Sequence, residues 1–338
     1  MMRRLAGAAL LATLVAMSLP STALADAAGP TDFRSEVVSV TPASDAVAFS
    51  IEGGDAFVRM VVLPGHEVVV SGHEDEPYLR IGPDGVVQQN RRSFATYANT
   101  SRRGDDQVPD IVDPMAEPDW ETVGSGGSWA WHDHRAHWMG RAPPIGLEPG
   151  GSLPAQDIPM IVDGVSTTVQ VVTTLQASPS VVPAIVGFLV GVVLVGLALL
   201  AGSATLVLVT AIVGVAALAT GAAQYLSMSG DTGPMVTWWL LPALATASAV
   251  AAMVATRPLS LVRSALVLLS GVELSLLGFR RRTGLVRAVI PTDLPFWLDR
   301  AVTAGTLVTS VIVVIASLVA LLRPPPRPIA YPAADAAG

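Results

Sequence analysis

The C-terminal half of the chain contains five apolar runs that are each long enough to cross a lipid bilayer. A membrane-spanning helix needs roughly 20 predominantly apolar residues. The runs are Val181–Ala201, Ala204–Ala223, Met235–Ala255, Leu259–Phe279 and Ala301–Leu322. Charged residues make up 14% of the 338 residues, whereas soluble globular domains carry roughly 25%. The sequence therefore predicts a membrane protein with the lipid bilayer as its partner. It excludes a soluble cytosolic enzyme, a disordered protein and a nucleic-acid-binding protein.

The first 25 residues have the three parts of a secretory signal peptide. Met1–Arg4 is basic, Leu5–Leu19 is apolar and rich in Ala, and Ala23–Ala25 is a small-residue cleavage site. We expect cleavage after this site, which would leave Asp26 as the mature N-terminus. The alternative is that the segment stays attached as a membrane anchor.

Composition changes sharply near residue 180. Residues 26–180 hold 22 of the 27 acidic residues, 9 of the 20 arginines and all five His, so their net charge is −13. We therefore predict a signal peptide (1–25), an extracytoplasmic domain (26–178), a transmembrane helical bundle (179–323) and a Pro/Ala-rich tail (324–338). The chain has no Cys, which excludes disulfides and thiolate metal sites.

Short runs rich in Val, Ile, Phe and Tyr predict strands in the extracytoplasmic domain. The runs are Ser35–Val40, Ala46–Ile51, Ala56–Leu63, His66–Val70, Tyr78–Ile81, Ile158–Val162 and Val165–Leu175. Between the last two, Asp163-Gly164 predicts a hairpin, because this pair suits the primed turns that match strand twist. The predicted fold class is a membrane protein with an extracytoplasmic all-β, sandwich-like domain followed by an α-helical transmembrane bundle of about five spans.

Five spans after a cleaved signal predict a multi-pass plasma-membrane protein with an extracytoplasmic N-terminal domain and the C-terminus inside. The distribution of arginines conflicts with this topology, because cytoplasmic loops normally carry the excess of basic residues. The arginines on the wrong side are Arg280, Arg281, Arg282, Arg287 and Arg300. The alternative has four spans with residues 259–300 on the cytoplasmic side. Five spans are favoured because Trp238, Trp239 and Trp297 then lie at the outer interface.

One segment, Trp129–Met139, concentrates side chains that can bind a metal ion. It holds three of the five His within six positions, namely His132, His134 and His137. On a strand, His132 and His134 would share one face, and His137 would join them after a bend. On a helix, His134 and His137 would be the neighbouring pair.

We predict a transition-metal site from these residues. His132, His134 and His137 would be ligands, and Asp133 would be a fourth ligand or would orient one of the rings through a hydrogen bond. Copper is the favoured cofactor because Met139 follows the histidines in a domain expected outside the cytoplasm, and zinc is the alternative.

Two other interpretations of the same segment remain open. In the first, Asp133 and Arg135 form an ion pair, Trp131 and Trp138 pack a small core, and the His side chains are hydrogen-bonded structure. In the second, the segment docks another envelope membrane protein. An extracytoplasmic hydrolase is a weaker hypothesis, because the sequence offers no general base beyond Asp133. We therefore favour a protein that is not an enzyme.

Three known metal signatures do not fit. The H-x-H-x-D-H signature of metallo-β-lactamase-like hydrolases would need Asp where the chain has Ala136. A histidine brace needs His at the mature N-terminus, where we expect Asp26. The H-E-x-x-H signature of zincins is absent from the sequence.

Two features stand out within the apolar runs. Glu273 lies inside the fourth run, and an ionisable residue there is costly, so it usually faces protein or water. Alternatively, Glu273 reaches the interface or pairs with Arg280. In the first run, Gly187 and Gly191 form a G-x-x-x-G motif, which is typical of close helix packing.

Part of the chain is similar to a group of uncharacterised actinobacterial membrane proteins. The residues that carry this resemblance are Glu76–Gly85, then Asn90, Ser93, Thr96, Tyr97 and Asn99, and finally Trp131–Met139, the W-H-D-H-R-x-H-W-M string. The resemblance covers most of residues 30–175. It implies a signal peptide, a β-rich ectodomain and C-terminal transmembrane helices, and it implies no activity.

Two functions follow as hypotheses. The first is a membrane-anchored extracytoplasmic binding protein that handles a transition metal, copper above all, through its His cluster. The alternative is a non-catalytic structural or assembly factor of the cell envelope, which docks a partner protein and binds no metal.

Overall fold

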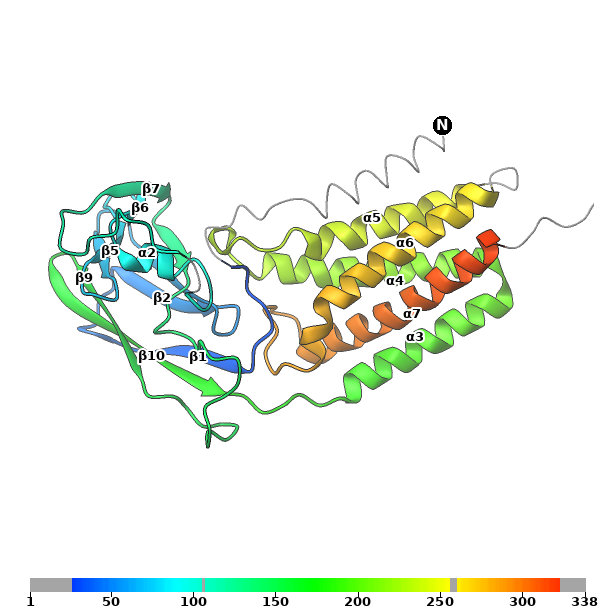
Figure 1. The fold of residues 1–338 in the computed structure, drawn as a ribbon, viewed down its shortest axis with the longest axis horizontal. Coiled ribbons are helices and arrows are strands. Elements are labelled where there is room, and N and C mark those ends of the chain that lie inside the picture. The colour runs from blue at the N-terminus through cyan, green and yellow to red at the C-terminus, as the bar shows by residue number, and fades with distance from the viewer. Residues whose placement is uncertain (1–25, 105–106, 256–259, 323–338) are drawn as a thin grey trace, which may run out of the picture.

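The computed structural model describes residues 26–104, 107–255 and 260–322. A β-rich region occupies the N-terminal part and lies at one end of a bundle of long helices (Figure 1). This arrangement confirms the coarse prediction of a β-rich region followed by apolar helices. The predicted signal peptide (1–25) and the predicted Pro/Ala-rich tail (324–338) lie outside the described residues.

The β-rich region contains two antiparallel sheets. The seven-stranded sheet has, in spatial order, β1 (Phe33–Thr41), β10 (Val165–Leu175), β9 (Gln156–Val162), β4 (Val68–Ser71), β5 (Pro77–Ile81), β6 (Val87–Asn90) and β7 (Trp120–Gly124). The three-stranded sheet has β2 (Val47–Glu52), β3 (Phe57–Val62) and β8 (Ser128–Trp131). A short helix, α2 (Phe94–Ala98), follows β6, and the Ser93 side chain caps it by accepting a hydrogen bond from the backbone N–H of Ala95.

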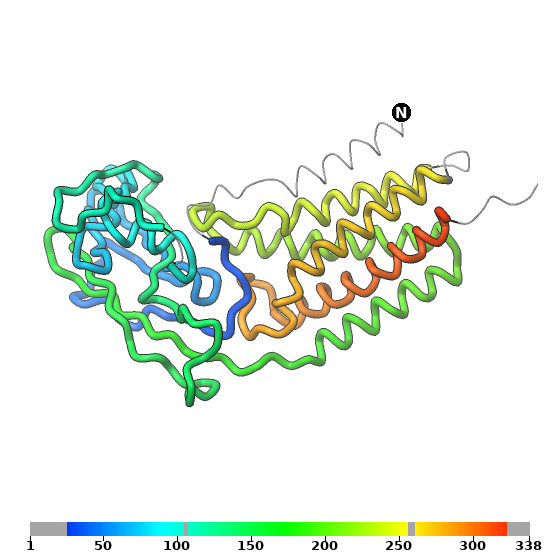
Figure 2. The backbone as a smooth tube through the Cα atoms, in the orientation of Figure 1, coloured from blue at the N-terminus to red at the C-terminus, as the bar shows by residue number. Residues whose placement is uncertain are grey.

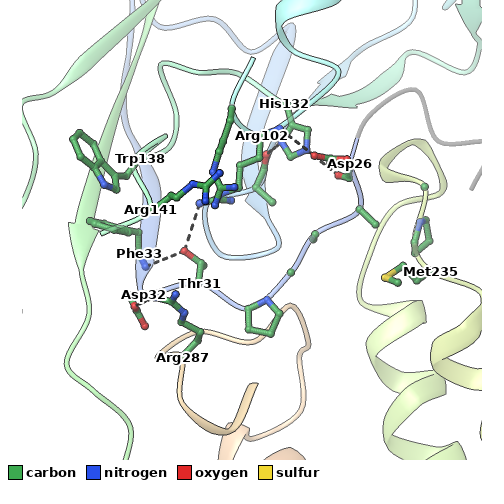
Figure 3. Close-up of a pocket in the computed structure, with 18 of the residues that line it drawn as sticks. Asp26, Thr31, Asp32, Phe33, Arg102, His132, Trp138, Arg141, Met235 and Arg287 are labelled. Atoms are coloured by element: carbon green, nitrogen blue, oxygen red, sulfur yellow. Dashed lines mark hydrogen bonds and ion pairs between the residues drawn. The ribbon is translucent and has the colours of Figure 1, made fainter. Parts of the chain in front are cut away.

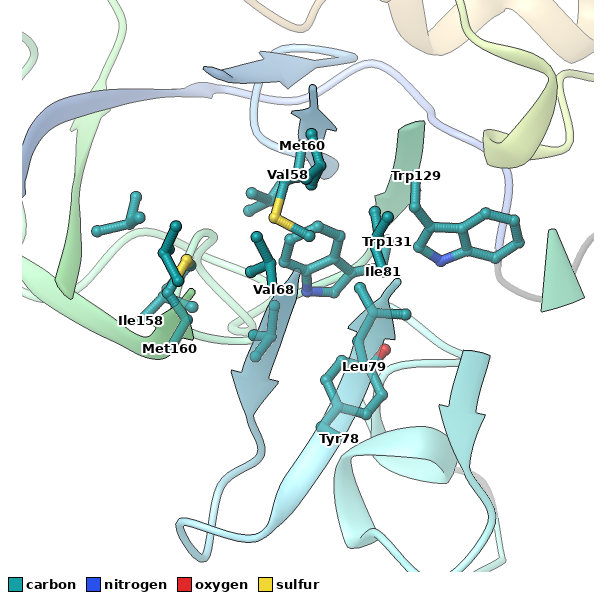
Figure 4. Close-up of a cluster of buried hydrophobic side chains, with 14 of the residues drawn as sticks. Val58, Met60, Val68, Tyr78, Leu79, Ile81, Trp129, Trp131, Ile158 and Met160 are labelled. Carbon is teal, nitrogen blue, oxygen red and sulfur yellow. The ribbon is translucent and has the colours of Figure 1, made fainter. Parts of the chain in front are cut away.

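One apolar core is shared by the two sheets. In β10 buried side chains alternate with more exposed ones, as expected for a strand with one face on a core. Met60 from the smaller sheet and Leu79 and Ile158 from the larger one belong to this core and have no exposed surface (Figure 4). The predicted hairpin is confirmed, since Asp163 and Gly164 both have positive φ, at 49° and 80°, as a type I′ turn requires.

Five helices in the described residues are long and apolar enough to cross a membrane. They are α3 (Val182–Ala201), α4 (Ser203–Leu226), α5 (Thr237–Val254), α6 (Ser260–Arg281) and α7 (Phe296–Leu322). Each corresponds to one of the five predicted apolar runs. The fifth run was predicted too short, because α7 begins at Phe296 and includes the charged residues Asp299 and Arg300.

Helix α3 packs against α7 through the predicted small-residue motif. A Cβ atom added at Gly187 would lie 2.0 Å from the carbonyl oxygen of Ala301, and one added at Gly191 would lie 2.8 Å from that of Gly305. The two helix backbones therefore approach each other as closely as only glycine allows.

The β-rich region is fastened to the bundle by contacts that we call the seam. Thr31 and Val289 form an isolated antiparallel bridge, with N···O distances of 3.0 and 2.8 Å. The Glu52 carboxylate accepts a hydrogen bond of 2.9 Å from the backbone N–H of Ser229. An apolar cluster joins Ala28, Ala56, Phe57 and Ala130 to Met228 and Trp238. The backbone after Asp26 runs between the two parts (Figure 2).

The arginines that conflict with the charge rule gather at this same end of the bundle and have partners there. Arg287 forms an ion pair with Asp32 across the seam, and Arg281 pairs with Asp299. Arg300 donates hydrogen bonds to three backbone carbonyls, those of residues 284, 287 and 288. The Asp32–Arg287 contact holds residue 287 beside the β-rich region.

Candidate functional site

The predicted site lies at the end of β8 and in the tight turn that follows it. Strand β8 ends at Trp131, and the turn is closed by a hydrogen bond of 2.8 Å from the Ala136 N–H to the Asp133 carbonyl. The three histidines are therefore presented neither on a strand nor on a helix, which are the two geometries that the spacing suggested. We call residues 131–138 the histidine corner.

Asp133 is the buried centre of the histidine corner. Its carboxylate accepts hydrogen bonds of 2.8 Å from both Nε and Nη2 of Arg135 and one of 3.1 Å from the Trp131 indole. Burial alone would raise the pKa of Asp133, but the charge and hydrogen bonds of Arg135 outweigh it and hold the pKa at about 2. Arg135 also donates to the carbonyls of Ser71 and Gly72. This network confirms the expected ion pair between Asp133 and Arg135. The Asp133 oxygens are used in these structural hydrogen bonds.

His132 fastens the start of the described chain to the core. Its Nδ1 faces the carbonyl oxygen of Ala56, and its Nε2 lies 2.8 Å from the carbonyl oxygen of Asp26. The ring also stacks on Phe57, with centroids 4.2 Å apart. Burial lowers the pKa of His132, and a neutral imidazole donates one hydrogen bond. Both ring nitrogens face backbone carbonyl oxygens, so only one of the two contacts is a hydrogen bond while the ring is neutral.

His134 and His137 form a closer pair. The Nε2 of His134 lies 3.0 Å from the carbonyl of Ser101, and that of His137 lies 2.8 Å from the carbonyl of Arg102. Their ring centroids are 5.4 Å apart. Burial, helped by the charge of Arg102, lowers the pKa of His137 to about 3. Its Nδ1 is buried and has no hydrogen-bond partner among the described residues.

The sequence did not assign His73 to this cluster. Its ring stacks beside that of His134, with centroids 5.8 Å apart, and its Nε2 lies 3.3 Å from Oδ1 of Asn99. Nothing in the local sequence around residue 73 points to residue 134, since the fold alone brings them together. The fifth histidine, His66, bonds Asp163 at the hairpin turn instead.

The structure thus brings the predicted ligands together but gives two of them other roles. Asp133 serves Arg135, and both nitrogens of His132 face carbonyls. Within the described ranges, no group of three or more His, Asp or Glu side chains is arranged to hold a metal ion. Two other predicted residues lie at the edge of the histidine corner. The Trp138 ring packs against that of Phe33, with centroids 6.4 Å apart, and Met139 is exposed. Metal binding therefore stays a prediction.

A cavity of about 610 Å³ lies next to the histidine corner, between the β-rich region and the bundle. The β-rich region contributes residues 26–33, the arginines of the 102–103 loop, His132 and residues around Arg141 (Figure 3). The bundle contributes residues 233–237, Arg280 and Arg287. Sequence reasoning missed this seam cavity because its wall combines short segments scattered between residue 26 and residue 287.

Charged groups in the wall of the seam cavity are partly paired. Arg102 pairs with Asp55, which lies just behind the wall and is buried. Burial raises the pKa of the Asp55 carboxyl, although the charge of Arg102 opposes this shift. Arg287 pairs with Asp32.

Glu273 belongs neither to the histidine corner nor to the lining of the seam cavity. It lies in α6 with no exposed surface. The neighbouring Ser270 hydroxyl donates a hydrogen bond of 2.8 Å to the Ala245 carbonyl on α5. This placement agrees with the expectation that an ionisable residue in a span faces protein.

No family model, curated protein or solved structure matches this chain. The resemblance to the actinobacterial group stays a prediction, and the geometry of the site carries the functional argument.

Proposed function

We propose that this chain is a membrane-anchored extracytoplasmic binding protein that holds its ligand in the seam cavity. The five long apolar helices support a multi-pass membrane protein. In this proposal the membrane is the plasma membrane, and the β-rich region lies outside the cytoplasm. The core shared by the two sheets supports a sandwich-like domain. In this proposal the histidine corner holds one wall of the cavity in place, and the ends of the bundle helices form the opposite wall.

The observation that carries this proposal is the cavity itself. Its volume of about 610 Å³ lies within the range typical of small-molecule sites, roughly 300–1,000 Å³. Its wall combines arginines with apolar side chains such as Phe33, Trp138 and Met235. Such a mixture suits a ligand that has both a charged and an apolar part.

Filling the cavity should abolish binding. Gly29 lines it, and a Cβ added there would have no described atom within 4 Å, so Gly29→Trp should place an indole in the empty space. We expect native mass spectrometry of the full chain in mild detergent to show a bound small molecule in the wild type. We expect at least about a tenfold loss of that species in Gly29→Trp.

Gly230→Trp is the matched control. Gly230 is exposed at the same end of the bundle, a Cβ there would also meet no described atom within 4 Å, and the residue does not line the cavity. The control should keep the bound species. A wild-type chain that carries no ligand, or a ligand retained equally in both variants, would overturn the proposal.

A second candidate function is metal binding by His134 and His137 alone. The observation in its favour is that each ring bonds a backbone carbonyl through Nε2 and so has Nδ1 as its lone-pair nitrogen. Metal-bound histidines almost always have their other nitrogen held in this way. Two imidazole ligands suit a copper ion of low coordination number better than they suit zinc, which prefers four ligands.

This candidate is tested by the metal content of the full chain after exposure to Cu(I), Cu(II) and Zn(II). About one equivalent of copper, lost in His134→Ala/His137→Ala and kept in the control His66→Ala, would support it. Since the pKa of His137 lies at about 3, the proton of this ring should not compete with copper between pH 7 and pH 5. Copper that is bound equally by the double variant would exclude the pair.

A further inference from the structure

We propose that the seam cavity binds the phosphate-bearing headgroup of an anionic membrane lipid. This inference rests on the proposed function, because it names the ligand of the same cavity. It follows from three properties of the cavity wall: its excess positive charge, the kind of donors that it presents, and its position at the ends of two apolar helices.

The wall carries more positive than negative charge. Its arginines are Arg102, Arg103, Arg141, Arg280 and Arg287. Against them stand the carboxylates of Asp26 and Asp32 in the wall and that of Asp55 behind it. Among the residues that the structure describes, two positive charges are left in excess. In the part of the chain that the structure describes, none of Arg103, Arg141 and Arg280 forms an ion pair.

The donors suit a phosphate group. Guanidinium groups present planar pairs of N–H donors that match phosphate oxygens, and in Figure 3 the side chains of Arg102 and Arg141 both point toward Thr31. The start of α5 also borders the cavity, at residues 233–237. Within the described residues no side chain caps this helix, and its first turn contains no acidic residue. The positive end of this helix dipole therefore adds to the positive potential of the wall.

The position of the cavity favours a lipid over a free anion. Thr237 begins α5 and Arg280 lies in the last turn of α6, so the cavity lies level with the ends of two candidate membrane spans. The Arg280 guanidinium donates a hydrogen bond of 3.2 Å to the Thr237 hydroxyl and links these two helix ends. Phe279 and Trp297 are 58% and 60% exposed at the same end of the bundle, as expected of aromatic side chains in the headgroup layer.

A second hollow in the seam provides an internal comparison. It measures about 520 Å³ and is lined by Arg34 together with Glu36, Glu52 and Asp293. Carboxylates outnumber arginines there, so an anion would be repelled. The positive excess is therefore a property of the first cavity and not of the whole seam.

The test uses the full chain in nanodiscs made of equal parts phosphatidylglycerol and phosphatidylcholine. After release from the disc, native mass spectrometry measures which lipid stays bound. We expect phosphatidylglycerol to be enriched at least about tenfold over the zwitterionic lipid. In Arg103→Gln/Arg141→Gln/Arg280→Gln the enrichment should fall close to one. The control Arg34→Gln/Arg91→Gln/Arg282→Gln removes the same charge away from the cavity and should keep it.

A second arm separates a lipid headgroup from a free anion. The chain in pure phosphatidylcholine discs is titrated with inorganic phosphate and with glycerol phosphate, and binding is followed by calorimetry. Phosphate binding without enrichment of phosphatidylglycerol would overturn the lipid assignment and leave the proposed binding function standing. A third outcome is that the chain binds no phosphate and enriches no lipid, while Gly29→Trp still expels some other ligand. This outcome would overturn the lipid inference and leave the proposed function standing. If no ligand of any kind is found, the proposed function fails as well.

The triple variant could lose lipid binding because it fails to fold. A single substitution separates these two effects. Arg141 is exposed in a loop, so Arg141→Gln should fold like the wild type and lower the enrichment about threefold to fivefold. An unchanged enrichment in this folded variant would contradict a role for Arg141 in the site.

Discussion

Replacing Arg135 with Leu should lower the free energy of unfolding of the β-rich region by about 3–5 kcal/mol. The change would leave the carboxylate of Asp133, which has no exposed surface, with the Trp131 indole as its remaining side-chain donor in the described residues. A buried charge that loses its partner is among the most destabilising changes known in proteins. The carbonyls of Ser71 and Gly72 would lose their donors as well.

Urea unfolding of the purified full chain, followed by tryptophan fluorescence, measures this effect. The double variant Asp133→Asn/Arg135→Leu should be less destabilised than Arg135→Leu, because the unpaired charge is gone. Arg92→Leu, which changes a guanidinium bound to a carbonyl at the exposed rim, should cost roughly 0.5 kcal/mol or less. A loss below about 1 kcal/mol in Arg135→Leu would show that the pair does not stabilise the corner.

The same pair predicts a pH dependence. The folded pKa of Asp133, about 2, lies below its ordinary value of 3.8. The unfolded chain therefore binds this proton more readily than the folded chain does. The contribution of the pair is complete above about pH 4 and is lost as the pH falls toward about 2.

Much of the β-rich region was predictable because its strands carry their own pattern. Strands β1, β2, β3, β9 and β10 are long, rich in β-branched residues and bounded by turn residues. In contrast, β6 is Val87–Asn90, where two glutamines and an asparagine follow one valine. Its membership of the sheet depends on partners β5 and β7, and no local signal reports a partner 30 residues away.

The candidate site was predictable in composition and not in geometry. Spacing alone brought His132, His134 and His137 into one corner. What each ring does is decided by carbonyl oxygens of residues 26, 56, 101 and 102, which belong to segments far from the histidines in sequence. Every residue type has a carbonyl, so its placement leaves no trace in the sequence.

The charge rule for membrane topology was difficult to apply for a related reason. It counts basic residues in loops, but it does not ask whether they have partners. Arg281 and Arg287 are bound to Asp299 and Asp32, so part of the positive charge at this end of the bundle is neutralised within the protein. Acidic residues contribute little to the rule, yet Asp32 lies in the other half of the chain and explains why Arg287 lies beside the β-rich region.

Substituting Leu at Gly187 should separate α3 from α7 and destabilise the bundle by about 3 kcal/mol or more. A Cβ at this position would lie 2.0 Å from the Ala301 carbonyl oxygen, and overpacking against side chains alone already costs about 1–3 kcal/mol. Here the obstacle is backbone, which a change of rotamer cannot move. Thermal unfolding of the full chain in detergent measures the effect.

Gly196→Leu in the same helix is the control for Gly187→Leu. A Cβ at Gly196 would have no described atom within 4 Å, and Leu is favoured over Gly in a helix by roughly 1 kcal/mol. We therefore expect this variant to be as stable as the wild type or slightly more stable. Since α3 contributes no residue to the lining of the seam cavity, Gly187→Leu should unfold earlier and yet bind the same ligand while it is folded. Equal melting of the two variants would mean that Gly187 and Ala301 are not in contact and that α3 packs elsewhere.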